Sequence, residues 1–386
     1  MIKEFAVKIY LRIFRGLFTA FSFTLQKQKT VFVTSFADNS VYVMNALKER
    51  VPSEEIVVLK DNKLSATPNT FSDYKVFIFN DVKKPFEFIQ SIYHLATCRI
   101  IFIDNYFGFL AGMPNHKKQF IIQLWHAAGA IKKFGLEDKQ VKLRQPTALE
   151  RFQYAYDQVD YTVIGSDRMG ELFMDAFKTT KKQLLKTGIP RTDFFFNDLD
   201  MQKAKKKIID RYPFIKDKKV ILYAPTFREG RLSRRRLRMD YKKIKQSIDD
   251  DYILLVKFHP RLNKPFTADA LPGFVYDVSA HKNVNELLTI VDLLITDYSS
   301  LPFEFSLLKR PMVFYVPDLN RYSKSRGLWE PLQETVPGTI AKNTSELIEA
   351  INHASVNQKE FDAFNLRWNK YSDGQSTNDL INIFYH

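Results

Sequence analysis

Short apolar runs alternate with longer mixed segments along most of this chain. From Thr30 onward the runs are rich in β-branched and aromatic residues, and the segments between them have helical spacing, which is typical of parallel strands joined by helices. The predicted strands are 31–35, 56–59, 76–79, 100–103, 121–124 and 161–164 in the first half, and 220–223, 253–257, 274–276, 293–296 and 312–315 in the second. The pattern predicts an α/β protein with two parallel sheets.

The two series of strands are separated by a lysine-rich polar stretch at 201–212. A chain of 386 residues is long enough to form two domains with separate cores. We therefore expect an N-terminal domain over 25–195 and a C-terminal domain over 196–386, each with a doubly wound sheet. The last helical stretch, 357–368, is a candidate to pack back on the first domain.

Residues 1–24 predict a separate amphipathic helix. Its apolar residues recur every three or four positions with cations beside them; the apolar set is Ile2, Phe5, Ala6, Ile9, Ile13, Leu17 and Phe21, and the cations are Lys3, Lys8, Arg12 and Arg15. The scattered cations argue against a signal peptide and a spanning helix. Such a helix can lie in a membrane interface, where anionic lipid attracts its cations. We favour that role over the alternative, a helix that only packs on the core of the first domain.

Composition limits the classes of binding partner but does not select one of them. The net charge of +15, from 58 Lys and Arg against 43 Asp and Glu, implies nucleic acid, an anionic membrane or phosphate-rich substrates. The single cysteine, Cys98, excludes an internal disulfide and a cysteine-based metal site, and it favours a reducing, cytosolic compartment. No cluster of carboxylates or histidines has the spacing of metal ligands, and a divalent cation on a substrate diphosphate stays open.

A run of arginines in the second half is harder to assign. It contains Arg231, Arg234, Arg235, Arg236 and Arg238. Solvated loop charge is the default interpretation of such a run. Contact with lipid head groups or a substrate diphosphate is the functional alternative, and nucleic-acid binding ranks third because no nucleic-acid motif accompanies the run.

Two histidines directly follow predicted strands, at the carboxyl ends where open parallel sheets bind ligands. His126 comes soon after the strand 121–124, and His259 comes soon after 253–257. Neutral imidazole can take a proton near pH 7 and imidazolium can stabilise phosphate charge, so we predict catalytic roles for both. The other histidines have no supporting motif and are predicted to be structural or surface residues; they are His94, His116, His281, His353 and His386.

The second half adds residues suited to phosphate. Ser299 and Ser300 precede a predicted helix with Pro302 in its first turn, where free amides and the helix dipole favour phosphate; ordinary N-capping by serine is the alternative. Thr226 and Arg228 follow another strand and face the same edge. No Gly-rich phosphate loop occurs, which argues against ATP hydrolysis. These features indicate a cleft between two domains that handles a phosphorylated substrate.

Seven ordered segments resemble one known family, the CDP-glycerol glycerophosphotransferases that build teichoic acids, and among them the short wall teichoic acid glycerol-phosphate primases. The segments are IDNY at 103–106, WHAAGA at 125–130 with KFGL at 133–136, TGIPR at 187–191, YAPTFRE at 223–229, HP at 259–260, TDYSS at 296–300 and RGL at 326–328. Each is weak alone, but the ordered set is specific. Polymerases of the family usually carry Gly-Thr after the Trp-His pair, whereas Ala127-Ala128-Gly129 stands here and resembles the primases.

The resemblance implies two Rossmann-like domains in the GT-B arrangement, with the acceptor bound mainly by the first and CDP-glycerol by the second. It implies transfer of sn-glycerol phosphate to an undecaprenyl-diphosphate-linked ManNAc-GlcNAc disaccharide at the cytoplasmic face of the cell membrane, with release of CMP. Other teichoic acid enzymes are further candidate partners.

Residue roles follow from the same resemblance. His126 would be the general base on the attacking hydroxyl. The donor would be held by Thr226, Arg228, His259, Asp297, Ser299, Ser300 and Arg326, and acceptor or hinge positions would be Asn105, Gly129 and Arg191.

Several other functions stay open. One is a glycerol- or ribitol-phosphate polymerase of teichoic acid or capsule, and another is a sugar-transferring GT-B enzyme. A third is a non-catalytic basic module on membrane or nucleic acid, for which His126 and His259 would be dispensable. The sequence does not determine the polyol, the number of units added or the oligomeric state.

Overall fold

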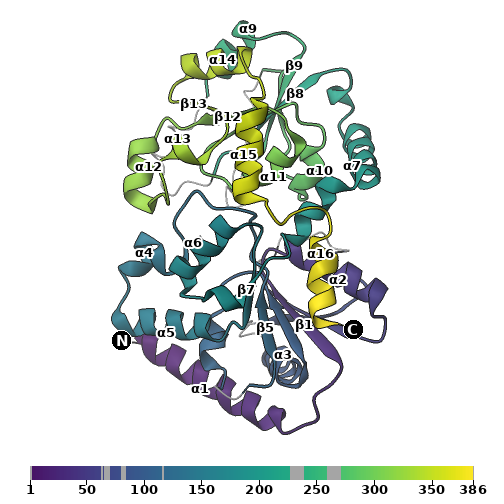
Figure 1. The fold of residues 1–386 in the computed structure, drawn as a ribbon, viewed down its shortest axis with the longest axis vertical. Coiled ribbons are helices and arrows are strands. Elements are labelled where there is room, and N and C mark those ends of the chain that lie inside the picture. Colours follow the sequence, from purple (N-terminus) through teal and green to yellow (C-terminus); the bar gives the residue numbers. More distant parts are fainter. Residues whose placement is uncertain are drawn as a thin grey trace. The chain divides into compact units, whose positions relative to one another are not determined.

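The computed structural model describes residues 2–61, 64, 70–79, 84–114, 117–226, 239–258 and 271–385. They form two compact units (Figure 1). The first contains Met1–Ala127, Phe134–Asp193 and Lys370–His386, and the second contains Ala128–Lys133 and Phe194–Asn369. The main division lies close to the expected boundary at 195. Two segments differ from the expected division, because 128–133 belongs to the second unit and 370–386 to the first.

The first unit is built on a seven-stranded parallel sheet with the order β3-β2-β1-β4-β5-β6-β7. The strands are β1 (Lys29–Thr34), β2 (Glu55–Asp61), β3 (Lys75–Phe79), β4 (Ile100–Ile103), β5 (Phe120–Gln123), β6 (Tyr161–Val163) and β7 (Leu184–Leu185). The direction of the strand order reverses between β1 and β4. The carboxyl ends of these two strands therefore form the switch point at which sheets of this kind bind ligands.

Helices and 3₁₀ turns connect these strands. They are α1 (Ile2–Ser22), α2 (Asp38–Arg50), α3 (Pro85–Thr97), η1 (Gly108–Gly112), η2 (Gly135–Glu137), α4 (Lys139–Lys142), α5 (Pro146–Asp157), α6 (Asp167–Phe177), η3 (Lys181–Gln183) and η4 (Pro190–Phe196). Both β1 and β4 are buried along their whole length. Their apolar runs, 31–33 in β1 and 100–103 in β4, are what a parallel sheet requires when helices cover its faces.

The second unit has a six-stranded parallel sheet with the order β10-β9-β8-β11-β12-β13. Its strands are β8 (Lys219–Tyr223), β9 (Tyr252–Val256), β10 (Val275–Asp277), β11 (Leu293–Thr296), β12 (Met312–Tyr315) and β13 (Thr339–Ala341). Its helices and turns are α7 (Asp198–Arg211), η5 (Pro213–Ile215), α9 (Tyr241–Ser247), α10 (Val284–Leu288), α11 (Leu301–Phe305), η6 (Ser306–Leu308), α12 (Leu319–Arg326), α13 (Leu332–Thr335), α14 (Thr344–Asn352) and α15 (Gln358–Trp368). The switch point lies between β8 and β11.

Successive residues of β8 point into two separate cores. Val220 and Leu222 belong to one buried cluster, and Ile221 and Tyr223 belong to the other. Because side chains alternate along a strand, this division shows that both faces of the sheet are covered. The predicted two-sheet α/β class is therefore correct for both units.

Two strands were not predicted. β7 consists of two half-buried residues, and β13 consists of three residues of which only Ala341 is buried. Both lie at sheet edges, where a strand pairs on one side only. Runs this short carry no periodic signal, so only the neighbouring strand reveals them.

Helix α1 packs on the core of the first unit with one face. Phe14 and Phe18 are fully buried, and the helix contacts α3 and η1. Phe5, Ile9 and Ile13 point outward with 66%, 41% and 52% of their surfaces exposed. We call these three residues the outer face of α1. The predicted apolar stripe did not include Phe14 and Phe18, and of its own residues Leu17 and Phe21 pack partly buried against the core whereas the outer face does not. Among the described residues, no helix has the length and apolarity needed to span a bilayer.

The chain returns to the first unit through α16 (Ser376–Phe384), which lies against α2 (Figure 1). The carboxylate of Asp193 accepts hydrogen bonds from the amides of Ser376 and Thr377 at 3.0 and 2.8 Å. Asp193 therefore caps the first turn of α16. The stretch 357–368 forms α15 and belongs to the second unit instead.

Candidate functional site

A buried carboxylate organises the switch point of the first unit. Asp104 follows β4 directly and is fully buried. It accepts a hydrogen bond of 2.9 Å from each of the amides of Ser35, Phe36 and Ala37, and a further one from the hydroxyl of Thr34. Burial raises the pKa of Asp104, and these hydrogen bonds act in the opposite direction. The carboxylate thereby holds the loop after β1, in which Ala37 has a φ of 70°, against the end of β4.

A strained turn places His126 at the same edge. Trp125 has a φ of 57°, a left-handed conformation that costs a non-glycine residue about 1 kcal/mol or more. Gln123 accepts the Trp125 amide at 2.9 Å, and the side-chain amide of Asn39 donates to the Trp125 carbonyl at 2.9 Å. Asn39 also donates to the Leu124 carbonyl at 3.2 Å. These bonds stabilise the turn that presents the histidine.

The geometry around His126 assigns the position of its proton. The ring stacks on Phe36 with centroids 4.0 Å apart, and Nδ1 lies 3.0 Å from the carbonyl oxygen of Asp104. A carbonyl oxygen can only accept, so Nδ1 carries the hydrogen. In the neutral ring Nε2 is then the nitrogen with a lone pair. His126 is half-buried, and it is held in the tautomer that a general base needs.

Asn105 and Arg191 have positioning contacts in the first unit. Asn105 donates to the Ser35 hydroxyl at 3.1 Å, which ties the ends of β1 and β4 together. Arg191 is 5% exposed, and it pairs with Asp38 at 3.0 Å. The Arg191 amide donates to the side-chain oxygen of Asn39 at 3.1 Å. Arg191 therefore supports the residue that braces the His126 turn.

The second unit repeats the buried carboxylate at its own switch point. Asp297 follows β11 and is fully buried. It accepts the amide and the hydroxyl of Thr226 at 2.9 and 2.6 Å, and the amide of Tyr298 at 2.6 Å. The structure therefore brings together two of the predicted donor-binding residues. Asp297 orients the loop after β8, as Asp104 orients the loop after β1.

The two predicted serines lie beside this carboxylate and are half-buried. The Ser299 hydroxyl accepts the Leu301 amide at 3.3 Å, whereas Ser300 makes no side-chain capping bond to α11. Ordinary capping therefore accounts for Ser299 and not for Ser300. The helix that follows has five residues and contains Pro302 in its first turn, as expected.

Gly129 packs in the second unit. A Cβ at this position would lie 2.5 Å from the ring of Phe303, so the backbone approaches that ring more closely than any side chain permits. The same segment continues to Lys133, whose amide donates to the Gly327 carbonyl at 3.1 Å. Arg326 is half-buried at the end of α12, next to this contact.

Several predicted features lie outside the described residues. They are Arg228, His259, the arginine run 231–238, and two of the histidines predicted to be structural or surface residues, His116 and His386. Their roles stay predictions. Within the described part of the chain, no group of three or more His, Cys, Asp or Glu side chains is arranged to hold a metal ion.

Asp104 and Asn39 were not predicted as site residues. Asp104 could have been predicted from the sequence, because it follows an apolar strand directly, as Asp297 does. No sequence pattern marks Asn39 as a site residue, since it lies on α2 and reaches the end of β5 only through the fold.

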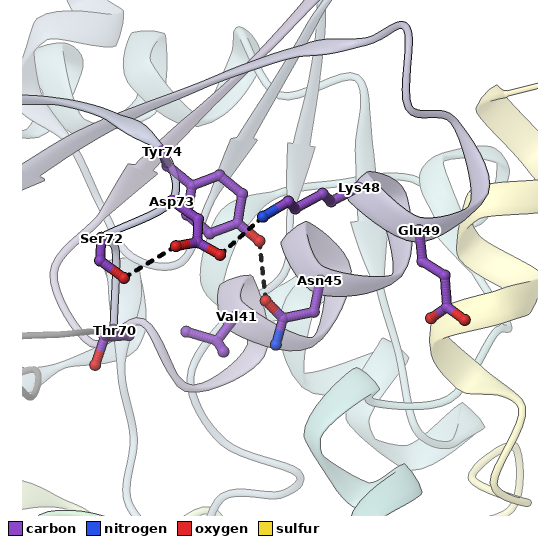
Figure 2. Close-up of a pocket in the computed structure, with 8 residues that line it drawn as sticks. All are labelled: Val41, Asn45, Lys48, Glu49, Thr70, Ser72, Asp73 and Tyr74. Atoms are coloured by element: carbon purple, nitrogen blue, oxygen red, sulfur yellow. Dashed lines mark hydrogen bonds and ion pairs between the residues drawn. The ribbon is translucent and has the colours of Figure 1, made fainter.

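The first unit also has a pocket whose polar side chains bind one another. It has a volume of about 640 Å³ beside α2 and is shown in Figure 2. Its polar groups bind one another: Lys48 pairs with Asp73 at 2.8 Å, and the Tyr74 hydroxyl donates to Asn45 at 2.9 Å. The switch points therefore remain the better candidates for the functional site.

Comparisons with known proteins point in the same direction. Residues 17–385 match the model of a family described as CDP-Glycerol:Poly(glycerophosphate) glycerophosphotransferase. A teichoic acid glycerol-phosphate primase from Bacillus subtilis (strain 168) is 34% identical over 95% of this chain and 94% of its own length. A teichoic acid ribitol-phosphate primase from Bacillus spizizenii (strain ATCC 23059 / NRRL B-14472 / W23) is 35% identical over 76% of this chain and 77% of its own length.

The fold has a close match among solved structures. A structure of the wall teichoic acid polymerase TagF soaked with CDPG superposes with a TM-score of 0.80 over 99% of this chain and 97% of that chain. The two sequences are 21% identical, so this likeness shows the shared fold. The predicted fold class is confirmed.

Proposed function

Because the chain belongs to the CDP-glycerol:poly(glycerophosphate) glycerophosphotransferase family and is therefore a transferase, we propose that it transfers sn-glycerol phosphate from CDP-glycerol to an undecaprenyl-diphosphate-linked ManNAc-GlcNAc disaccharide and releases CMP. Similarity to a glycerol-phosphate primase along nearly its whole length supports this reaction. The family membership confirms the resemblance read from the sequence, and it removes the interpretation as a non-catalytic basic module.

The hydrogen bond from His126 Nδ1 to the Asp104 carbonyl is the observation that carries the mechanism. It leaves Nε2 to take the proton from the attacking sugar hydroxyl. The sugar oxygen then bonds to the phosphorus that carries glycerol, and the bond from that phosphorus to the bridging oxygen breaks. CMP leaves with the electron pair, and the proton stays on His126. Such phosphoryl transfer depends mainly on positioning and on stabilising charge.

The second unit supplies the donor side of this proposal. The Thr226 hydroxyl is held by Asp297, and Ser299 and Ser300 lie at the same strand end. Arg228 and His259 are proposed to bind the diphosphate, as the family resemblance implies. Replacing either by Ala should cost about 2 to 4 kcal/mol of transition-state stabilisation, the range seen on removing oxyanion donors.

We propose that the protein lies peripherally at the cytoplasmic face of the cell membrane. The outer face of α1 supports this location, because Phe5, Ile9 and Ile13 expose apolar surface that the fold does not cover. Lys8 and Arg12 are also exposed on this helix. Apolar burial at the head-group boundary and attraction of these cations to anionic lipid both favour attachment.

The test is product analysis on a defined lipid-linked disaccharide. The protein is incubated with the acceptor and either CDP-glycerol or CDP-ribitol, and the product is weighed by mass spectrometry. We expect a glycerol phosphate adduct and CMP with CDP-glycerol. Ribitol phosphate is the second candidate, since the ribitol-phosphate primase is as similar in identity as the glycerol-phosphate primase. A product only with CDP-ribitol would reject the proposed donor, and no product with either would reject the reaction.

A further inference from the structure

A cavity of about 520 Å³ lies within the first unit, bounded by α1, the start of α3, η1 and α5. Figure 1 shows α1, α3 and α5 at one end of the unit, and η1 contacts both α1 and α5. We call it the aromatic pocket. Its volume falls in the range of small-molecule binding sites. The mechanism proposed above does not use it.

Aromatic side chains form two walls of this pocket. Tyr106 stacks on Phe152 with centroids 4.4 Å apart and planes inclined by 10°, and Tyr10 packs on Phe88 with centroids 5.6 Å apart. Val7 and other aliphatic carbons of α1 complete the lining. Rigid apolar walls of this kind favour a hydrocarbon ligand over a polar one.

The polar side of the pocket is cationic. Arg144 and Arg151 line it, and no carboxylate is among the described lining residues. Arg144 is exposed and lies over the ring of Phe152 at 5.2 Å. Arg151 is held by Glu4 at 2.7 Å, which fixes the start of α1 against α5. Both cations oppose the effect of burial on the pKa of Tyr106, so their field reaches into the pocket.

Exposed apolar side chains and the His126 turn both lie close in the chain to residues of this lining. Pro85 and Arg144 are chain neighbours of Phe86 and Leu143, whose side chains are 81% and 87% exposed. Tyr106, another lining residue, follows Asp104 by two residues, and the carbonyl of Asp104 lies 3.0 Å from Nδ1 of His126.

We propose that the aromatic pocket binds a prenyl diphosphate, with the first isoprene units of the lipid-linked acceptor against the aromatic walls and its diphosphate at Arg144. The identity of the acceptor rests on the proposed function. Arg151 is already paired with Glu4, so charge complementarity favours the anion at Arg144, and the apolar walls account for the chain. The acceptor sugar then extends along residues 104–106 toward His126.

The test is a binding titration of the full chain with farnesyl diphosphate, a soluble prenyl diphosphate, in the presence of CDP-glycerol. Gly108→Leu fills the pocket, because a Cβ at Gly108 meets only Tyr106 atoms at 3.8 and 4.0 Å. Gly16→Leu is the matched control, since no atom lies within 4 Å of a Cβ there and Gly16 does not line the pocket. We expect Gly108→Leu to weaken binding by about tenfold or more and Gly16→Leu to bind as the unchanged protein does.

A second pair of variants tests the charge. Arg144→Ala should weaken the binding of farnesyl diphosphate by about tenfold but leave the binding of farnesol unaffected. Lys139 is a cation outside the lining, so Lys139→Ala should change neither affinity. Equal affinities in Gly108→Leu and Gly16→Leu would overturn the proposal. So would binding of farnesyl diphosphate only when CDP-glycerol is left out of the titration, because the probe would then occupy the donor site.

The binding test and the test of the transfer reaction can fail independently of each other. If product analysis shows no transfer while the variants discriminate as expected, the pocket is a prenyl diphosphate site and the proposed function is wrong. If transfer occurs while Gly108→Leu binds farnesyl diphosphate normally, the reaction stands and the pocket assignment is wrong. Thermal unfolding is the control for folding: a Tm of Gly108→Leu equal to that of the unchanged protein would make a loss of binding local to the pocket.

Discussion

At the scale of single residues, two buried aspartates have the same structural role at the two switch points. Asp104 holds the loop after β1, and Asp297 holds the loop after β8, in each case by accepting backbone amides and a threonine hydroxyl. The contact that bears most directly on chemistry is the one between Asp104 and His126. The main-chain carbonyl of Asp104 accepts this hydrogen bond, whereas the side chain of Asp104 holds the loop after β1.

His126 is predicted to be essential for turnover. His126→Ala should lower kcat by roughly 100-fold or more, the scale expected for losing a positioned general base. Steady-state kinetics with CDP-glycerol and the lipid acceptor would measure it. His353→Ala is the matched control, because the Nδ1 of His353 also lies 2.9 Å from a backbone carbonyl, that of Glu349, but the residue is exposed on the second unit. Turnover near the unchanged value in His126→Ala would remove it from the base role.

His94 predicts a pH dependence of stability. The residue is 4% exposed, and burial followed by the charge of Lys29 lowers its pKa from 6.5 to about 3. Lys29 donates to its Nδ1 at 3.1 Å, so the folded ring stays neutral. Between these pH values the unfolded chain binds a proton that the folded protein does not. The free energy of unfolding should therefore fall as pH falls below 6.5, by up to about 1.4 kcal/mol per pH unit.

Urea unfolding at a series of pH values checks this expectation. His94→Gln keeps an acceptor for Lys29 and removes the titration, so its free energy of unfolding should depend less steeply on pH between about 6 and 4. The exposed His353→Gln variant should keep the slope of the unchanged protein. Parallel curves for His94→Gln and the unchanged protein would show that another group is responsible.

At the scale of elements, α1 presents two faces. Phe14 and Phe18 pack into the core, and Val7 and Tyr10 line the aromatic pocket from the same side of the helix, whereas the residues of the outer face are exposed. Its cations are also divided. Arg15 donates to the carbonyls of Gly112 and Met113 at 3.2 and 3.3 Å, so it stabilises the fold instead of being available to lipid.

The outer face is predicted to attach the protein to anionic vesicles. Replacing Phe5, Ile9 and Ile13 with Ser should release it in a sedimentation assay while changing thermal stability little, because all three are largely exposed. Phe14→Ser is the matched change on the buried face, and it should instead destabilise the fold by about 3 kcal/mol or more. Vesicle binding that survives the triple replacement would move attachment to another surface.

The cations of α1 should contribute separately from its apolar side chains. Lys8 and Arg12 together are expected to add about 2 kcal/mol near an anionic surface, or roughly 30-fold in affinity. Lys8→Ala with Arg12→Ala should remove this contribution, and the remaining binding should depend less on salt. An unchanged salt dependence would assign the electrostatic attraction to other residues.

At the scale of the whole molecule, the chain passes between the two units more than once. The segment 128–133, which begins two residues after His126, joins the second unit through Gly129 against Phe303 and through Lys133 bound to Gly327. The C-terminal segment returns to the first unit, where α16 is capped by Asp193. The chain therefore enters the other unit two residues after the predicted catalytic histidine.

The product is predicted to carry one glycerol phosphate per acceptor. The segment Ala127-Ala128-Gly129 resembles primases, and Gly129 leaves no room for a side chain against Phe303. Mass spectrometry of the product at a large excess of CDP-glycerol measures the number of units. A ladder of longer products would make the enzyme a polymerase.

Local patterning was enough to predict most of the framework. The strands from β1 to β6 and from β8 to β12 were recognisable because a buried parallel strand must be a continuous apolar run. The positions of His126 and Asp297 followed, since both lie where such runs end. The ordered motifs also identified the family, because each motif is short and contiguous in the chain.

Tertiary packing decided what depends on distant neighbours. Asn39 braces the His126 turn from α2, and the proton on His126 is placed by a carbonyl 22 residues earlier in the chain. Which face of α1 is buried was settled by α3 and η1, because apolar residues occur on more than one side of this helix. The sequence alone determines which residues can form strands and helices, since that preference is local; the partners of a side chain are set by packing between segments far apart in the chain, and they had to come from the structure.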